Sequence, residues 1–260
     1  MQNVKTAIKK ALSLDYNSFV EPLKNLKYIG SHHHGYYIPA KFLNDSSICY
    51  CIGAGVDVSF DTELIVNYNS KVYIFDPAPD AKEHFNKVKN AATNGEKFAV
   101  GKKVPFTYRL TGQQLENVQF IEKGLWNEST VLKFYKATDS NYPSHSIDLF
   151  NGSSEFIEAP VERLSSIMKK LNHTYIDLLK IEIEGAEYVV INTIIEDKPD
   201  IKVILVEFDE LFHPKDYKYL FRIKKATESL LKAGYKLAHS TPHFKRLFVR
   251  EDVFEDLKKK

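Results

Sequence analysis

The sequence predicts an α/β protein with a Rossmann-like, doubly wound sheet that is mostly parallel and carries helices on both faces. From residue 47 onwards, apolar segments rich in β-branched and aromatic residues alternate with amphipathic segments. The apolar segments are nearly continuous, as expected for strands covered on both faces. The last two strand-like segments follow one another without a helix between them, which predicts an antiparallel hairpin at the end of the sheet.

Five parallel strands are predicted in the central part of the chain. They are Ile48–Ile52, Val72–Phe75, Val118–Ile121, Ile176–Ile183 and Val203–Phe208. The amphipathic segments predicted as helices are Ala81–Ala92, Val161–Leu171, Ala186–Ile195 and Phe221–Leu231, the last of them capped by Gly234. The hairpin is expected to pair Tyr235–His239 with Arg246–Arg250 through a turn at Thr241 and Pro242.

Two regions fit this alternation less well. Residues 1–45 are expected to form an N-terminal helical and loop extension, with a helix carrying Val4, Ile8 and Leu12 and a polar stretch around His32–His34. Residues 46–260 are then the main domain. Within it, Thr130–Lys136 predicts an extra strand or hairpin arm, and Ala137–Glu158 predicts a long polar loop that is either a lid or plain disorder.

Composition excludes several classes of protein. The chain has 260 residues, and 36 Lys and Arg against 34 Asp and Glu give a net charge of +2. Only 5 of the basic residues are Arg and no basic stripe is present, which disfavours nucleic acid as the main partner. No apolar run approaches the length of a membrane span and the N-terminus is a poor signal peptide. Cys49 and Cys51 are expected to be buried thiols, so a reducing cytoplasm is the expected location.

A glycine turn directly after the first predicted parallel strand indicates a ligand site. Gly53, Ala54 and Gly55 follow the strand, and a helical pattern starts soon afterwards. Such a turn lets a ligand approach the backbone, and the helix N-terminus favours an anionic group. Asp76 ends the next strand, at the spacing expected for an acid that binds the two hydroxyls of a ribose.

The turn lacks the features of two common phosphate sites. Val58 stands where a dinucleotide fingerprint has its third glycine, and no Gly-Lys-Ser/Thr follows. A ribose ligand without a pyrophosphate therefore fits better, which predicts S-adenosyl-L-methionine as the cofactor. A turn that needs glycine only for packing is the alternative. Pro77, Gly124 and Leu125 are further predicted cofactor contacts.

Carboxylates at later strand ends form a second candidate site. Lys180, Glu182 and Glu184 alternate at the end of one predicted strand and would share a face. Glu207 and Asp209 lie at the end of the next. In open α/β sheets ligands bind at the carboxyl ends of the strands, so these side chains predict a polar pocket. Simple ion pairing of Lys180 with Glu182 or Glu184 is the alternative.

The stretch Ile176–Glu187 resembles the most characteristic segment of the FkbM-type family of class I S-adenosylmethionine-dependent methyltransferases. The glycine turn and Val72–Pro77 match the family's cofactor-binding positions, and the resemblance covers roughly residues 47–250. It implies O-methylation of a hydroxyl on a sugar, glycan or natural-product small molecule. Three departures stand out: Cys51 replaces the usual acid before the turn, Asp57 replaces a third glycine, and Glu182 replaces an Asp. Asp57 is therefore a candidate for the missing carboxylate at the cofactor.

Methyl transfer to a hydroxyl benefits from a proton acceptor. Glu182, His145 and His213 are the candidates. His32–His34 are assigned to a polar loop because consecutive side chains diverge, and no metal site is predicted. Two other functions stay open, namely a scaffold that binds the cofactor without catalysis and another ribose-ligand enzyme such as a nucleotide-sugar enzyme. The oligomeric state is not predicted.

Overall fold

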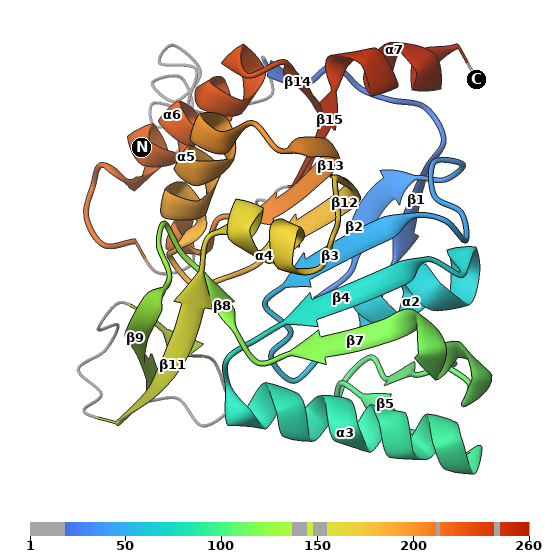
Figure 1. Ribbon diagram of the computed structural model, residues 1–260. Helices are drawn as coiled ribbons and strands as arrows, with labels where there is room; N and C mark the ends of the chain where they lie inside the picture. The colour runs from blue at the N-terminus through green and yellow to red at the C-terminus, as the bar shows by residue number, and fades with distance from the viewer. Residues whose placement is uncertain (1–18, 137–144, 148–154, 212–213, 242–244, 260) are drawn as a thin grey trace.

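A mixed seven-stranded sheet forms the centre of the computed structural model, which describes residues 19–136, 145–147, 155–211, 214–241 and 245–259 (Figure 1). Its strands, in spatial order, are β14 (Tyr235–Ser240), β15 (Lys245–Arg250), β13 (Asp200–Glu207), β12 (Tyr175–Ile181), β3 (Ile48–Ile52), β4 (Lys71–Phe75) and β7 (Val118–Ile121). The five strands from β13 to β7 pair in parallel. Strand β15 pairs antiparallel with both β13 and β14. The predicted α/β sheet with a closing hairpin is therefore confirmed.

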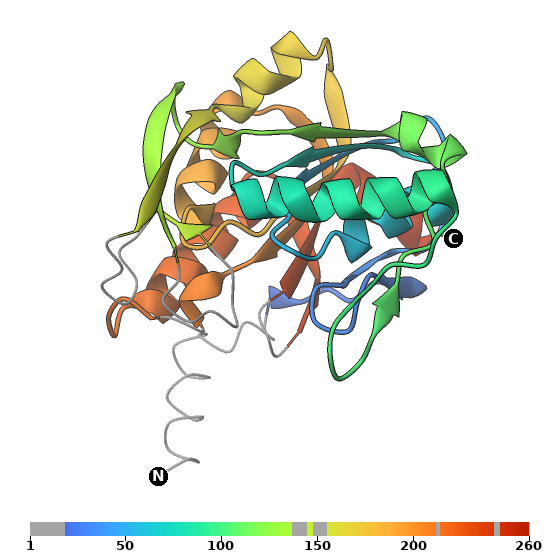
Figure 2. The same ribbon diagram turned by 90° about the horizontal axis from the view of Figure 1, so that it is seen from below.

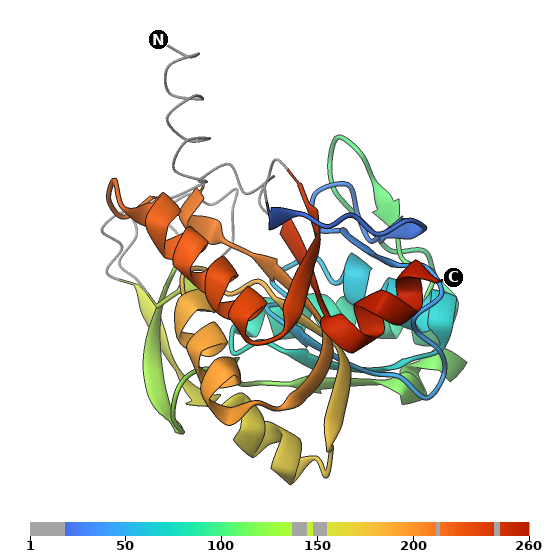
Figure 3. The same cartoon turned by 90° about the horizontal axis from the view of Figure 1, so that it is seen from above.

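Helices cover both faces of the sheet. They are α2 (Ser59–Tyr68), α3 (Pro79–Asn94), α4 (Leu164–Lys170), α5 (Glu187–Asp197), α6 (Tyr219–Lys232) and α7 (Glu251–Lys258), with short 3-10 turns η2 (Gln113–Asn117) and η4 (Asp209–Leu211). Helices α2, α3 and α7 contribute to one buried apolar cluster, whereas α4, α5 and α6 contribute to the other. Figure 3 shows α5 and α6 side by side, and Figure 2 shows α3 running alongside β7.

The strands divide their side chains between the two clusters with the period of two that a pleated strand dictates. In β3, Cys49 and Cys51 belong to the α2 side, whereas Tyr50 and Ile52 belong to the α5 side. Both thiols are buried, as predicted. Because apolar residues face both ways, the strand reads as a continuous apolar run in the sequence.

The N-terminal region departs from the predicted helical and loop extension. Strands β1 (Leu26–Ile29) and β2 (Tyr36–Pro39) form an antiparallel hairpin. Tyr36 and Ile38 are buried in the same apolar cluster as α2 and α7. The polar histidine stretch is the hairpin's connection, so tertiary burial of a few apolar residues outweighs its loop-like composition. The predicted helix at Val4–Leu12 lies outside the described residues.

A second, four-stranded sheet follows β7. It has the order β10 (His145–Ser146), β9 (Thr130–Lys136), β11 (Phe156–Glu162) and β8 (Gly124–Leu125). Strand β9 confirms the predicted extra strand. Val161 was expected to start a helix, but it pairs with Gly124 in this sheet and α4 begins only at Leu164. The strand pairing of Val161 and Glu162 satisfies their backbone polar groups, so the helix begins later in the chain than predicted.

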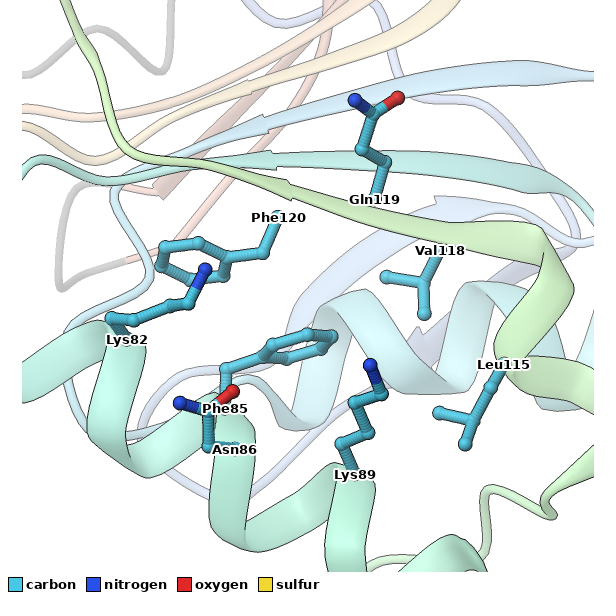
Figure 4. A pocket seen from close by; sticks show the side chains of 8 residues that line it. All are labelled: Lys82, Phe85, Asn86, Lys89, Leu115, Val118, Gln119 and Phe120. Carbon is cyan, nitrogen blue, oxygen red and sulfur yellow. The ribbon is translucent and has the colours of Figure 1, made fainter.

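Two further features contain no predicted site residue. Strands β5 (Ala99–Val100) and β6 (Phe106–Thr107) form a small ribbon. A cavity of about 230 Å³ lies between α3 and β7 (Figure 4) and is lined by Lys82, Phe85, Asn86, Lys89, Leu115, Val118, Gln119 and Phe120. None of these is a predicted site residue. Among the helices of the described ranges, none combines the length and apolarity needed to cross a membrane.

Candidate active site

The two glycines of the turn after β3 have different surroundings. Both have positive φ, +85° at Gly53 and +51° at Gly55. A Cβ on Gly53 would lie 1.7 Å from the carbonyl oxygen of Glu182, so close packing against the end of β12 requires glycine there. A Cβ on Gly55 would meet no described atom within 4 Å. The first glycine thus serves packing, and the second borders open space in which a ligand can lie.

Asp76, at the end of β4, supports this turn directly. Its Oδ2 accepts hydrogen bonds from the backbone N–H groups of Ala54 at 2.8 Å and Gly55 at 2.9 Å. Its Oδ1 accepts one from Ala78 at 2.8 Å, and the residue is only 7% exposed. A carboxylate offers about four lone-pair positions. One position is therefore left for a ribose hydroxyl, fewer than the pair of bonds predicted from the sequence.

Of the other predicted cofactor residues, Asp57 follows the glycine turn and Pro77 follows Asp76, whereas Gly124 and Leu125 form β8. Asp57 accepts hydrogen bonds from the Ser31 hydroxyl at 2.8 Å and from the Ser59 backbone at 2.9 Å, which fixes its carboxylate while leaving it partly exposed. Pro77 and Gly124 lie together, since a Cβ on Gly124 would be 3.6 Å from Cγ of Pro77. Leu125 is buried in β8.

Lys180 joins the glycine turn to the carboxylates at the end of β12. Its side chain is only 2% exposed, and its Nζ donates to the carbonyl oxygen of Gly53 at 2.8 Å. The same Nζ lies 3.2 Å from Oε2 of Glu182 and 3.9 Å from Oδ2 of Asp61. Burial lowers the pKa of Lys180, but the two acids raise it by more, so the ammonium stays charged.

Asp61 lies one turn into α2 and was missed by the sequence analysis. It is fully buried, and burial raises its pKa against the opposing effect of Lys180. Asp61 lies beside the buried ammonium of Lys180 and has no exposed surface, so it balances that charge, and Asp57 stays the candidate for the acid missing at Cys51. An acidic residue in the helical pattern that follows the glycine turn was the available signal.

Glu182 has a partner on each oxygen. Its Oε2 accepts a hydrogen bond from the Tyr36 hydroxyl at 3.0 Å and pairs with Lys180, while its Oε1 lies 3.4 Å from Nδ1 of His34. Burial raises the pKa of Glu182, but Lys180, Lys245 and His34 lower it by more, and the net shift is strongly downward. Its side chain remains 20% exposed. Glu182 is therefore a fixed, ionised carboxylate with access to solvent.

Glu207 lies beside Glu182 at the end of β13. Its Oε2 is 3.3 Å from Nζ of Lys245 and 3.5 Å from the Tyr36 hydroxyl. Burial and the neighbouring charge of Glu182 raise the pKa of Glu207 to about 8, against the effect of Lys245. Of the two acids, Glu182 therefore carries the charge at neutral pH, and Glu207 holds a proton.

The predicted catalytic residues are only partly brought together. Lys180 and Glu182 form the ion pair that was the alternative interpretation, whereas Glu184 lies in the turn after β12, with its N–H bonded to Asp209. His145 belongs to β10 and its backbone is paired with Lys136; its side chain lies outside the described residues, as does all of His213. His34, assigned to a polar loop, is the histidine that reaches Glu182.

No metal centre is found in the described part of the chain, where no three His, Cys, Asp or Glu residues are grouped to hold an ion. The charged groups at the strand ends instead pair with one another.

The chain is similar to a known protein family and to several solved structures. The family described as "Methyltransferase FkbM domain" matches residues 47–237. No curated protein matches the chain significantly. Among solved structures, the fibrillarin pre-rRNA processing protein of Methanococcus jannaschii is 14% identical, with 89% of this chain and 86% of that chain covered and a TM-score of 0.42. Precorrin-6y C5,15-methyltransferase from Geobacter metallireducens is 12% identical, with 81% and 82% covered and a TM-score of 0.41.

Proposed function

The chain belongs to the FkbM methyltransferase family, and from that premise we propose that it transfers a methyl group from S-adenosyl-L-methionine to a hydroxyl of a sugar, a glycan or a natural-product small molecule. Family membership confirms the methyltransferase class and the cofactor that the glycine turn predicted. The identity of the acceptor atom is the proposal.

The residues around the glycine turn fit this cofactor. The open space beside Gly55 gives it room. Asp76 would hold the ribose through its one remaining acceptor position. Asp57 would hold the methionyl amine, because its carboxylate is fixed yet partly exposed. When bound, S-adenosyl-L-methionine supplies an electrophilic methyl group on a sulfonium.

The assignment of a hydroxyl acceptor rests on the position and the charge of Glu182. The backbone of Glu182 contacts Gly53, and Lys180 ties its carboxylate to the carbonyl oxygen of the same glycine. A fixed carboxylate that is ionised and reachable from solvent can orient a hydroxyl or support a base that deprotonates it. A hydroxyl acceptor needs such help, because its own pKa is far above neutrality.

We assign the site around Glu182 to polar, uncharged acceptor molecules. Its accessible groups, His34 and Glu182, offer hydrogen bonds and a negative charge, which suit a hydroxyl-rich molecule and repel phosphate. We further propose residues 46–260 as the methyltransferase domain. The hairpin β1–β2 of the preceding segment contributes to this site, since Tyr36 and His34 both reach Glu182.

Two measurements test this function. Calorimetry with S-adenosyl-L-methionine and S-adenosyl-L-homocysteine is expected to show one site, and nucleotide sugars are expected not to bind. Purified protein should then release S-adenosyl-L-homocysteine with sugars, oligosaccharides or polyhydroxylated natural products, with the methyl group located on oxygen by mass spectrometry. Transfer only to amines or RNA would contradict the proposal. Cofactor binding without transfer to any acceptor would favour a scaffold.

A further inference from the structure

We propose that His34, in the connection of the N-terminal hairpin, is the general base that takes the proton of the acceptor hydroxyl, and that Glu182 is the residue that positions it. This inference rests on the proposed hydroxyl acceptor. His34 lies outside the region matched by the family, residues 47–237, so the family assigns it no role.

The turn that carries His34 is held from three sides. The Ser31 hydroxyl donates to Asp57 at 2.8 Å and accepts from the N–H of His34 at 3.2 Å. The Ser31 N–H donates to the Ser59 hydroxyl at 2.7 Å. Nζ of Lys245 donates to the carbonyl oxygens of His33 at 2.7 Å and Gly35 at 3.3 Å. The backbone at His34 is thus fixed to the glycine turn and to β15.

The imidazole is oriented by a carboxylate that is itself fixed. Nδ1 of His34 lies 3.4 Å from Oε1 of Glu182, while Tyr36 and Lys180 occupy Oε2. A carboxylate partner places the proton of the neutral ring on Nδ1 and leaves Nε2 as an acceptor. Within the described residues no group hydrogen-bonds to Nε2, and the side chain is 51% exposed. Nε2 is therefore available to a substrate hydroxyl.

The charges around His34 suit a base that works near neutrality. Burial lowers its pKa, but the hydrogen bond to Glu182 and the charges of Glu182 and Asp57 raise it by more, against Lys245, so the net shift is upward. Its neighbour His33 shifts the other way, because burial, the two adjacent histidines and Lys245 all lower its pKa. Among the described residues, His34 is the member of the triplet that is paired with a carboxylate. A carboxylate alone, with a pKa of about 4, is a poor match for a hydroxyl proton.

The step balances without a further reactant. The hydroxyl oxygen of the acceptor forms a bond to the methyl carbon, while the bond from that carbon to sulfur breaks and its electron pair goes to sulfur. The hydroxyl proton passes to Nε2 of His34. The resulting imidazolium is stabilised by the adjacent carboxylate of Glu182. A base that is oriented by a neighbouring group is a common arrangement in enzymes.

The triplet offers a matched control for the test. His34→Gln is expected to lower kcat roughly 10²–10³-fold while the KM for S-adenosyl-L-methionine stays within about threefold. In the wild type, kcat should rise with pH as the imidazole loses its proton, and this acidic limb should disappear in the variant. His32→Gln removes a neighbouring imidazole that does not contact Glu182, and it should keep both the rate and the limb.

A titration of the histidine ring by NMR tests the pair without turnover. In Glu182→Gln, the pKa of His34 is expected to fall, because the carboxylate that raises it is gone. Wild-type turnover and an intact acidic limb in His34→Gln, with O-methylation by the wild type, would overturn the role of His34 and leave the proposed function standing. Failure of the wild type to methylate any hydroxyl would overturn both. A His34 pKa that is insensitive to Glu182 would refute the positioning.

Discussion

The two halves of the site are built on different principles. On the donor side, formed by residues 53–57 and Asp76, a carboxylate binds backbone N–H groups within a single strand–helix–strand unit. On the acceptor side, formed by His34, Tyr36, Glu182, Glu207 and Lys245, side chains from distant segments bind one another. Local backbone geometry shapes the first, and long-range packing shapes the second. Variants on the two sides should therefore affect different measurements.

The largest expected effect comes from Gly53, the donor-side glycine that packs against Glu182 of the acceptor side. Gly53→Ala places a Cβ 1.7 Å from the carbonyl oxygen of Glu182, so the turn and the end of β12 must separate. We expect a loss of stability above about 4 kcal/mol, measured by thermal or denaturant unfolding. Gly55→Ala is the matched control, since it costs only about 1–2 kcal/mol of left-handed strain. Equal stability of the two variants would contradict this division of roles.

The next largest effect isolates the acceptor side. Glu182→Gln removes the charge that orients His34 and pairs with Lys180. We expect turnover to fall roughly 10²–10⁴-fold, while affinity for S-adenosyl-L-methionine, measured by calorimetry, changes by no more than about threefold. Unchanged turnover would remove Glu182 from the chemistry. A large loss of cofactor affinity would mean that the two sides are not separable at this residue.

Asp76→Ala isolates the donor side. The variant leaves the N–H groups of Ala54 and Gly55 without their acceptor and removes the ribose contact. We expect cofactor affinity to fall roughly 10–100-fold, with a stability loss of about 1–3 kcal/mol. Turnover at saturating cofactor should change less than in Glu182→Gln. Wild-type affinity in a folded Asp76→Ala protein would refute the role of Asp76 at the cofactor.

The smallest effect concerns Glu207 and the pH dependence of stability. Its pKa of about 8 in the folded protein exceeds the value of about 4.3 in an unfolded chain. The folded state therefore binds this proton more tightly, and the contribution of Glu207 to stability is lost as pH rises from about 5 to 8. Glu207→Gln, which mimics the protonated acid, should flatten this decline by about 1–3 kcal/mol in unfolding experiments at several pH values. Parallel curves would contradict the raised pKa.

The same contrast explains what could be predicted from the sequence. Strand β3, the glycine turn and Asp76 could be predicted because a continuous apolar run and short residue spacings encode local structure. The contact of His34 with Glu182 spans 148 residues, and no local pattern encodes it. Strands β1 and β2 are only four residues long, too short for a clear alternation, and Val161 was misplaced because its pairing with Gly124 is also non-local. Helix period alone could not reveal that Asp61 is buried beside Lys180.

The hairpin β1–β2 has a consequence for how such an enzyme can change its choice of acceptor. Lys245 holds the turn through the carbonyl oxygens of His33 and Gly35, which are present whatever side chains these positions carry. Ser31 supplies two further anchors, one to Asp57 and one to the Ser59 hydroxyl. Side chains at positions 32 and 33 can therefore be exchanged while the turn and His34 keep their places. Substitutions in this segment can therefore change which acceptor the enzyme selects, without disturbing the residues that bind the methyl donor.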